Sequence, residues 1–215
     1  MDAVAADQDE YYVESETLQA FIAQVKAIIV TSSSPSTAVE ALREPFARLL
    51  ADPSWLPQEF RQRAPQSGMG GGIGQWLLYR SADRSLTLFS LVVPPGSATP
   101  VHDHLAWGLV GLYEGAQEER VYRLTRSLGE GHGELELATV RHLRTGDFYP
   151  LIPPQDDIHQ VMTTSSVPSI SLHLLARDVG CIWRHQYEPE HARIRPFRSG
   201  YTNVACEDER PPLPT

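Results

Sequence analysis

Residues 101–108 read VHDHLAWG and place His102 and His104 two positions apart, directly after the turn-forming stretch PPGSATP at 94–100. Successive side chains of a β-strand point to opposite faces, so residues two apart share one face. The two imidazoles can therefore lie side by side in the interior of a β-rich fold. From this spacing alone, a metal site and a pair of structural histidines are both open interpretations.

The sequence around this pair is typical of an all-β domain. From Gln75 onward, short apolar and β-branched runs such as WLLYR, SLTLFSLVV and SISLHLLA recur at intervals of roughly ten residues. Gly, Pro, Asp and Ser separate these runs, and no helical pattern alternates with them. We therefore predict a β-sandwich or barrel over residues 66–200 rather than a doubly wound α/β fold. The stretch SGMGGGIG at 67–74 lacks the residues of a phosphate-binding loop and is predicted to be a flexible loop.

Residues 1–65 are predicted to form a helical segment. In SETLQAFIAQVKAIIV the apolar residues fall at helical spacing after a plausible capping residue, Ser15. A second helix is expected in SPSTAVEALREPFARLL, with Ser34 or Ser36 as its cap, and a short third helix in PQEFRQR. Residues 201–215 are expected to form a C-terminal tail.

The composition excludes several classes of function. The chain has 215 residues and a formal net charge of −9, without a basic run, which argues against binding nucleic acid or an anionic membrane. No apolar run reaches the ~20 residues that span a bilayer, and the N-terminus lacks the pattern of a signal peptide. Two cysteines, Cys181 and Cys206, imply no disulfide framework. We therefore expect a cytoplasmic protein in a reducing environment.

A second stretch completes a known pattern. GDFYPLIPPQDDIH at 146–159 leads through a prolyl turn to His159. With VHDH it resembles the two-part metal motif of the cupins, which are double-stranded β-helix barrels of the jelly-roll type. The resemblance implies a mainly β cupin barrel behind an N-terminal helical segment. It also implies a metal site made of His102, His104 and His159.

One departure from the cupin pattern concerns charge. Many cupins carry a glutamate ligand four or five residues after the second histidine, where this chain has Gly108 and Leu109. Three neutral imidazoles leave the full charge of a divalent ion uncompensated and leave coordination positions open. Such a centre favours an anionic ligand, and both iron(II) and zinc suit it.

Beyond the cupins, the chain resembles the bacterial thiol dioxygenases, the group of cysteine dioxygenase and 3-mercaptopropionate dioxygenase. The resemblance runs from about residue 45 to 205 and is carried by TPVHDHLAWGLVGLYEGA, GDFYPLIPPQDDIH, PSISLHLL, RHQYEP and PFRSGYTN. It implies that the three histidines hold iron(II) and that dioxygen adds both of its atoms to the sulfur of a bound thiol, giving a sulfinate.

The resemblance also implies substrate-binding residues. Gln75 stands where cysteine-specific members have an arginine, and glutamine at this position is typical of the 3-mercaptopropionate type. The arginine of that type corresponds to Arg184, whose guanidinium can bind a carboxylate through two parallel hydrogen bonds. Arg177 has no counterpart in the family. It either faces solvent or reaches a second acidic group of the substrate.

A second departure lies in the Ser-x-His-x-Tyr relay of the family. Ser171 and His173 match, but the tyrosine position is Leu175. Three explanations are open: another tyrosine such as Tyr149 or Tyr187 fills the space, the substrate brings its own polar group, or the substrate or activity differs. Gly108 also occupies the position of the crosslinking cysteine of mammalian cysteine dioxygenase, so no crosslink is expected. The remaining histidines are interpreted as structural or solvated: His132, His142, His185 and His191.

These features predict an iron(II) thiol dioxygenase that acts on a small carboxylate-bearing thiol such as 3-mercaptopropionate, mercaptosuccinate or a cysteine-like compound. Two alternatives are open. One is a cupin isomerase, lyase or hydrolase with another divalent metal. The other is a non-catalytic cupin that binds a small acid.

Overall fold

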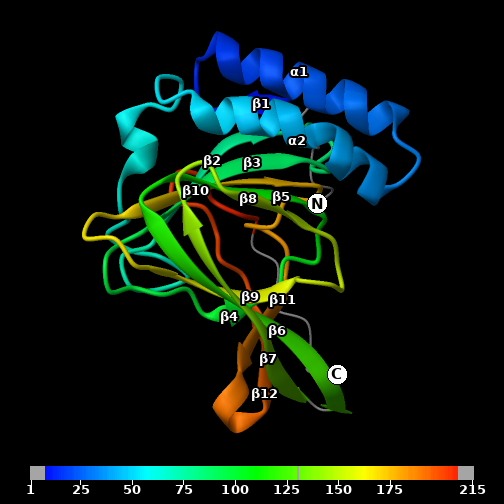
Figure 1. Cartoon of the computed structure of the whole chain (residues 1–215), viewed down its shortest axis with the longest axis vertical. Coiled ribbons are helices and arrows are strands. Elements are labelled where there is room, and N and C mark those ends of the chain that lie inside the picture. The colour runs from blue at the N-terminus through cyan, green and yellow to red at the C-terminus, as the bar shows by residue number, and fades with distance from the viewer. Residues whose placement is uncertain (1–7, 130, 208–215) are drawn as a thin grey trace.

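The computed structural model describes residues 8–129 and 131–207. Within them, two α-helices, α1 (Glu16–Thr31) and α2 (Pro35–Ala51), lie ahead of a domain built of β-strands (Figure 1). The strands are β1 (Glu10–Tyr11), β2 (Gly74–Arg80), β3 (Thr87–Val93), β4 (Val101–His102), β5 (Gly108–Glu114), β6 (Ala116–Gly129), β7 (His132–Arg144), β8 (Phe148–Leu151), β9 (Ile158–Thr163), β10 (Ser169–Leu175), β11 (Arg184–Glu188) and β12 (Arg193–Phe197).

The helices begin where their capping residues predict. The Ser15 hydroxyl accepts a hydrogen bond from the backbone N–H of Leu18 at the start of α1. Ser34 rather than Ser36 caps α2, in a reciprocal capping box with Thr37. The expected third helix is a short 3-10 helix, Gln58–Arg61.

The strands form two antiparallel sheets. The order of the first is β1-β2-β3-β10-β5-β8, and the second, β11-β12-β7-β6-β9-β4, closes on itself. The chain crosses between the sheets after β3, β4 and β5, and again after each strand from β7 to β10, which gives a double-stranded β-helix. The prediction of a mainly β barrel with double-stranded β-helix architecture, behind an N-terminal helical segment, is confirmed.

The first sheet separates two apolar layers. Its outer face packs under α1 and α2, which lie across it in Figure 1, and contributes Leu172 and Leu174 to the core beneath the helices. Its inner face contributes Phe89 and Leu175 to a second cluster inside the barrel. Because side chains alternate along β10, Ser171 and His173 lie on the same inner face as Leu175.

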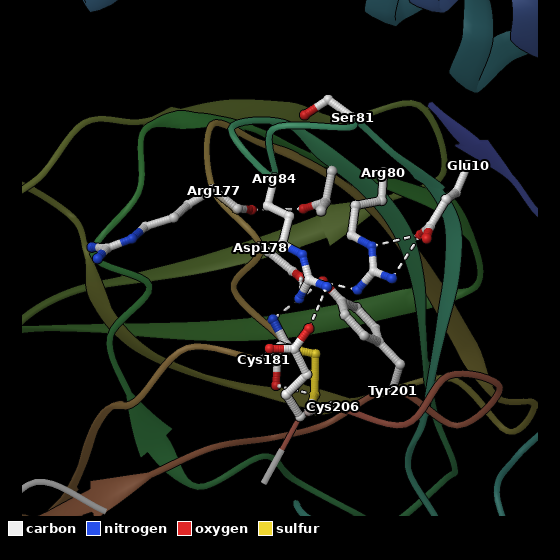
Figure 2. A network of polar contacts seen from close by, with 12 residues as sticks. Glu10, Arg80, Ser81, Arg84, Arg177, Asp178, Cys181, Tyr201 and Cys206 are labelled. Atoms are coloured by element: carbon white, nitrogen blue, oxygen red, sulfur yellow. Dashed lines mark hydrogen bonds and ion pairs between the residues drawn. A yellow bond between two sulfur atoms is a disulfide. The ribbon is translucent and has the colours of Figure 1, made fainter. Parts of the chain in front are cut away.

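The prediction that the cysteines form no disulfide is wrong. Cys181 and Cys206 are joined, with their Cα atoms 5.2 Å apart and a sequence separation of 25. Figure 2 shows this disulfide beside Asp178 and Tyr201, whose hydroxyl donates a hydrogen bond to the Asp178 carboxylate at 2.9 Å. The argument from cysteine usage for a reducing compartment therefore no longer holds, because disulfides persist mainly in oxidising ones.

The residues around Cys206 belong to the barrel rather than to a loose tail. Thr202 exchanges hydrogen bonds with the backbone of Gln75, and Asn203 does the same with Leu77. The chain from Ser199 to Glu207 thus lies against β2 and against the loop that follows β10. We call these residues the C-terminal strap. The rest of the predicted tail lies outside the described residues.

Neither described helix combines the length and the apolar character that a membrane-crossing helix requires.

Replacing Cys206 with serine is expected to lower the free energy of unfolding by about 3 kcal/mol, because the opened loop regains conformational freedom in the unfolded chain. Denaturant unfolding without reductant measures this difference. Wild-type protein treated with reductant should unfold at the midpoint of the variant. Equal midpoints for the variant and the oxidised wild type would contradict the disulfide.

Candidate metal centre

Three buried histidines converge on one point inside the barrel. His102 at the end of β4 pairs directly with His159 of β9, and His104 follows in the next turn. Their candidate ligand nitrogens all lie within 4.8 Å of one another, and the ring centroids are 4.8–5.0 Å apart. The predicted metal-binding histidines are therefore brought together as a group that could hold a metal ion.

Hydrogen bonds select the protonation of two of these rings. The Pro100 carbonyl lies 2.9 Å from Nδ1 of His102, and a Glu119 carboxylate oxygen lies 2.7 Å from Nδ1 of His159. Carbonyl and carboxylate oxygens only accept hydrogen bonds, so each Nδ1 carries the proton and each Nε2 keeps a free lone pair. Burial, together with the charge of Arg184, holds the pKa of His102 well below its usual range. His102 is thus in the neutral form that binds metals.

The backbone explains why no carboxylate joins the histidines. A Cβ atom on Gly108 would lie 1.9 Å from the Leu174 carbonyl oxygen, because β5 and β10 approach closely there. Leu109 is fully buried in the core beneath the helices, on the other face of the sheet. Neither position can direct a glutamate toward the histidines, so among the described residues the ligand group consists of imidazoles alone.

A buried arginine lies beside the histidines. Arg184, the first residue of β11, is 3% exposed, and burial lowers its pKa to about 10. Its guanidinium donates hydrogen bonds to the carbonyl oxygens of Val179 and Asp103 and to the Ser199 hydroxyl, and it lies over the Phe197 ring. All of these partners are neutral, and no carboxylate of the described residues forms an ion pair with it. Its positive charge therefore remains available to an anionic ligand.

Gln75 is buried and lines a cavity. It pairs with Leu91 across β3, and Leu91 pairs with Ser171, so Gln75 faces the interior. Its side chain is 3% exposed, yet Nε2 has no hydrogen-bond partner among the described residues. The cavity has a volume of about 320 Å³ and is also lined by Ser199, the hydrogen-bond partner of Arg184. An unpartnered buried amide is costly unless a ligand or water satisfies it.

The relay strand places His173 close to the histidine group. Its Nε2 lies 3.0 Å from the Ser171 hydroxyl, its ring stacks on Phe89, and its centroid is 6.0 Å from that of His104. Its Nδ1 is buried and has no partner in the part of the chain that the structure describes, and burial holds the pKa of His173 well below the usual range. Leu175 is fully buried in the apolar cluster with Phe89.

The two tyrosines considered as substitutes for the missing relay tyrosine have other contacts. The Tyr149 hydroxyl lies 3.5 Å from Nδ1 of His159, and the Tyr187 hydroxyl donates to the Asp103 carboxylate at 3.0 Å. Arg177 is exposed, with its guanidinium near the Leu105 carbonyl.

Three buried carboxylates near the histidines, those of Asp103, Glu119 and Asp157, were not predicted. Asp103 accepts hydrogen bonds from the backbone and the ring of His185, at 2.8 and 2.7 Å. This contact gives the half-exposed His185 a structural role, whereas His132, His142 and His191 are exposed. Glu119 supports His159. Asp103 could have been identified from its position between the two histidines of the HxH motif. Nothing in the sequence distinguishes Glu119 from the other glutamates.

No protein-family model matches the chain. Among solved structures, it is similar to a conserved protein with a double-stranded β-helix domain from Klebsiella pneumoniae, at 16% identity and a TM-score of 0.41 over 56% of this chain and 81% of that chain. A cupin 2 domain-containing protein from Halorhodospira halophila matches at 15% identity and 0.37, over 59% and 69%. An oxalate decarboxylase from Lactobacillus farciminis matches at 14% and 0.40, over 53% and 31%. These similarities do not extend beyond the general architecture.

The low pKa of His173 predicts how stability depends on pH. Below about pH 6.5 the unfolded chain takes up a proton that folded His173 does not, so each such histidine costs ~1.4 kcal/mol of stability per pH unit as the pH falls. In the metal-free protein, His173→Gln is expected to make the loss of stability between pH 6.5 and 5 shallower by about this amount. Urea unfolding at several pH values measures the slope. His142→Gln, at an exposed position, is the control and should keep the wild-type slope, and an equally steep slope in both variants would contradict the burial argument.

Proposed function

We propose that this protein is an iron(II)-dependent thiol dioxygenase that oxidises a small thiol carrying a carboxylate to the sulfinate. The observation that supports this function best is the pairing of a three-histidine group with a buried arginine that has no carboxylate partner among the described residues. A thiolate and a carboxylate on one small molecule would supply both missing negative charges. Overall, RSH and O2 give RSO2H, in which sulfur loses the four electrons that dioxygen gains.

The residues present fit a divalent metal ion. His102, His104 and His159 would hold it, since all three are buried and the first and third have a free Nε2 lone pair. When bound, iron(II) supplies a coordination site for sulfur and the electron transfer between sulfur and dioxygen. The absence of a carboxylate ligand at Gly108 leaves room for an anionic substrate.

Arg184 and Gln75 would orient the substrate. A guanidinium has five N–H donors, and the contacts to Val179, Asp103 and Ser199 leave donors free for a carboxylate. Charge-assisted hydrogen bonds of this kind are stronger in a dry site than in water. The unpartnered Nε2 of Gln75 offers a further donor in the adjoining cavity. These contacts favour 3-mercaptopropionate, mercaptosuccinate or a cysteine-like thiol.

His173 and Ser171 would handle the proton. His173 is neutral, one ring nitrogen is held by the Ser171 hydroxyl, and the other has no partner. A neutral imidazole in this position can hold or pass on the proton that the thiol loses. With Leu175 in place of the relay tyrosine, this imidazole acts without a phenol from its own strand.

Protein loaded with iron(II) is expected to consume dioxygen with 3-mercaptopropionate, mercaptosuccinate or cysteine, and to produce one sulfinate for each dioxygen. Oxygen-electrode assays combined with mass spectrometry of the product test this expectation, with zinc-loaded protein as the control. The proposal fails if a panel of thiols that differ in carboxylate number and amine content gives no uptake above the control.

Arg184→Ala is expected to raise KM for the carboxylate-bearing thiol about 10- to 100-fold, the loss for a hydrogen bond to a charged group. For a thiol that lacks a carboxylate, such as 2-mercaptoethanol, KM should stay the same. Arg177→Ala is the matched control, since it removes an exposed arginine. Steady-state kinetics of both variants decide, and equal KM values in wild type and Arg184→Ala would exclude carboxylate binding by Arg184.

A further inference from the structure

Glu119 is a fully buried carboxylate in contact with a candidate metal ligand. Its Oε1 lies 2.7 Å from Nδ1 of His159, and its side chain has no exposed surface. The contact follows from sheet register, because Val121 of β6 lies directly opposite His159 of β9 and Glu119 lies two residues before Val121 on the same face. Glu119 therefore reaches diagonally across the strand pair to the back of the imidazole.

The other oxygen of Glu119 is bound by a cation. Arg141 of β7 lies 2.9 Å from Oε2, packs its guanidinium over the Tyr149 ring and also pairs with Asp156. The Arg141 side chain is 25% exposed. Histidine, carboxylate and arginine thus form a chain that runs from the candidate metal centre to the protein surface.

This chain gives Glu119 a defined chemical effect on His159. A carboxylate that accepts the Nδ1 proton holds the lone pair on Nε2 and orients the ring. It also makes the imidazole a stronger donor, because negative charge behind the ring offsets the positive charge that it shares with a metal. Arg141 opposes this effect by drawing charge from the carboxylate.

We propose that Glu119 is a positioning residue for the metal centre, whose carboxylate fixes the Nδ1–H tautomer of His159 and strengthens it as a ligand, and that Arg141 moderates this effect. Glu119 thereby places a negative charge behind His159, partly offset by Arg141, whereas no carboxylate ligand is present at Gly108. The inference rests on the three-histidine site of the proposed function, but not on the reaction with thiols.

Titration of the metal-free protein with Co²⁺ tests the proposal directly. Glu119→Gln keeps the shape of the side chain but removes its charge, and is expected to weaken Co²⁺ binding about 10- to 100-fold. Glu118→Gln is the matched control, since Glu118 is the neighbouring residue and pairs with Arg120 instead. Wild-type affinity in Glu119→Gln, or an equal loss in both variants, would overturn the proposal.

Arg141→Gln separates an electrostatic role from a packing role. With the arginine removed, the Glu119 charge acts on His159 unopposed, and Co²⁺ should bind more tightly than in wild type. When Glu119 is already replaced by Gln, the further change Arg141→Gln should alter the Co²⁺ affinity several-fold less than it does in the wild-type protein. If Glu119→Gln and Arg141→Gln weaken Co²⁺ binding to the same extent, Glu119 has only a packing role and the proposal is wrong.

The tautomer of His159 provides a measurement on the unaltered protein. In the metal-free protein labelled with ¹⁵N-histidine, NMR should show His159 protonated at Nδ1, with the proton resonance shifted downfield by the carboxylate. Protonation at Nε2 would overturn the proposal even if Glu119→Gln does not fold. Co²⁺ affinity that depends on Glu119, combined with no thiol oxidation, would leave the inference standing and remove the proposed function alone.

Discussion

The carboxylate of Asp103 ties the candidate metal centre to the strand that carries the arginine. It lies between His102 and His104 in sequence and accepts hydrogen bonds from His185 and Tyr187 of β11. The backbone carbonyl of the same residue accepts a hydrogen bond from Arg184. Because these contacts are largely buried, Asp103 holds His102 and His104 at a fixed distance from the guanidinium of Arg184. The geometry of the pocket is therefore built into the same turn that presents the ligands.

Asp157 holds the opposite side of this turn. Its two carboxylate oxygens accept hydrogen bonds from the backbone N–H groups of His104 and Leu105, and it lies two residues before His159. The loop that carries His104 is thus held by hydrogen bonds from two sides, from β11 and from the residue just before β9. The charges around this frame are paired differently: Arg184 has no carboxylate partner in the described part of the chain, whereas Glu119, behind His159, pairs with Arg141.

The sequence alone allowed prediction of the features that depend on local patterns. The HxH spacing, the alternation of apolar residues and the helix caps follow from neighbouring residues, and the position of His159 followed from a two-part motif. The contacts between distant strands did not. Glu119 and His159 are 40 residues apart and meet only through the register of β6 and β9, which a single sequence does not reveal. The disulfide was missed for a similar reason, since it depends on the return of the C-terminal strap to the loop after β10.

The close approach of β5 and β10 at Gly108 also limits how this protein can change during evolution. Any side chain at this position would collide with the Leu174 carbonyl, which is backbone and has no rotamer with which to move away. A single substitution therefore cannot introduce a glutamate ligand or a reactive cysteine here. A lineage that starts from this chain would have to shift a whole strand before it could test either chemistry. The backbone contact between β5 and β10 therefore keeps the candidate ligand group restricted to histidines.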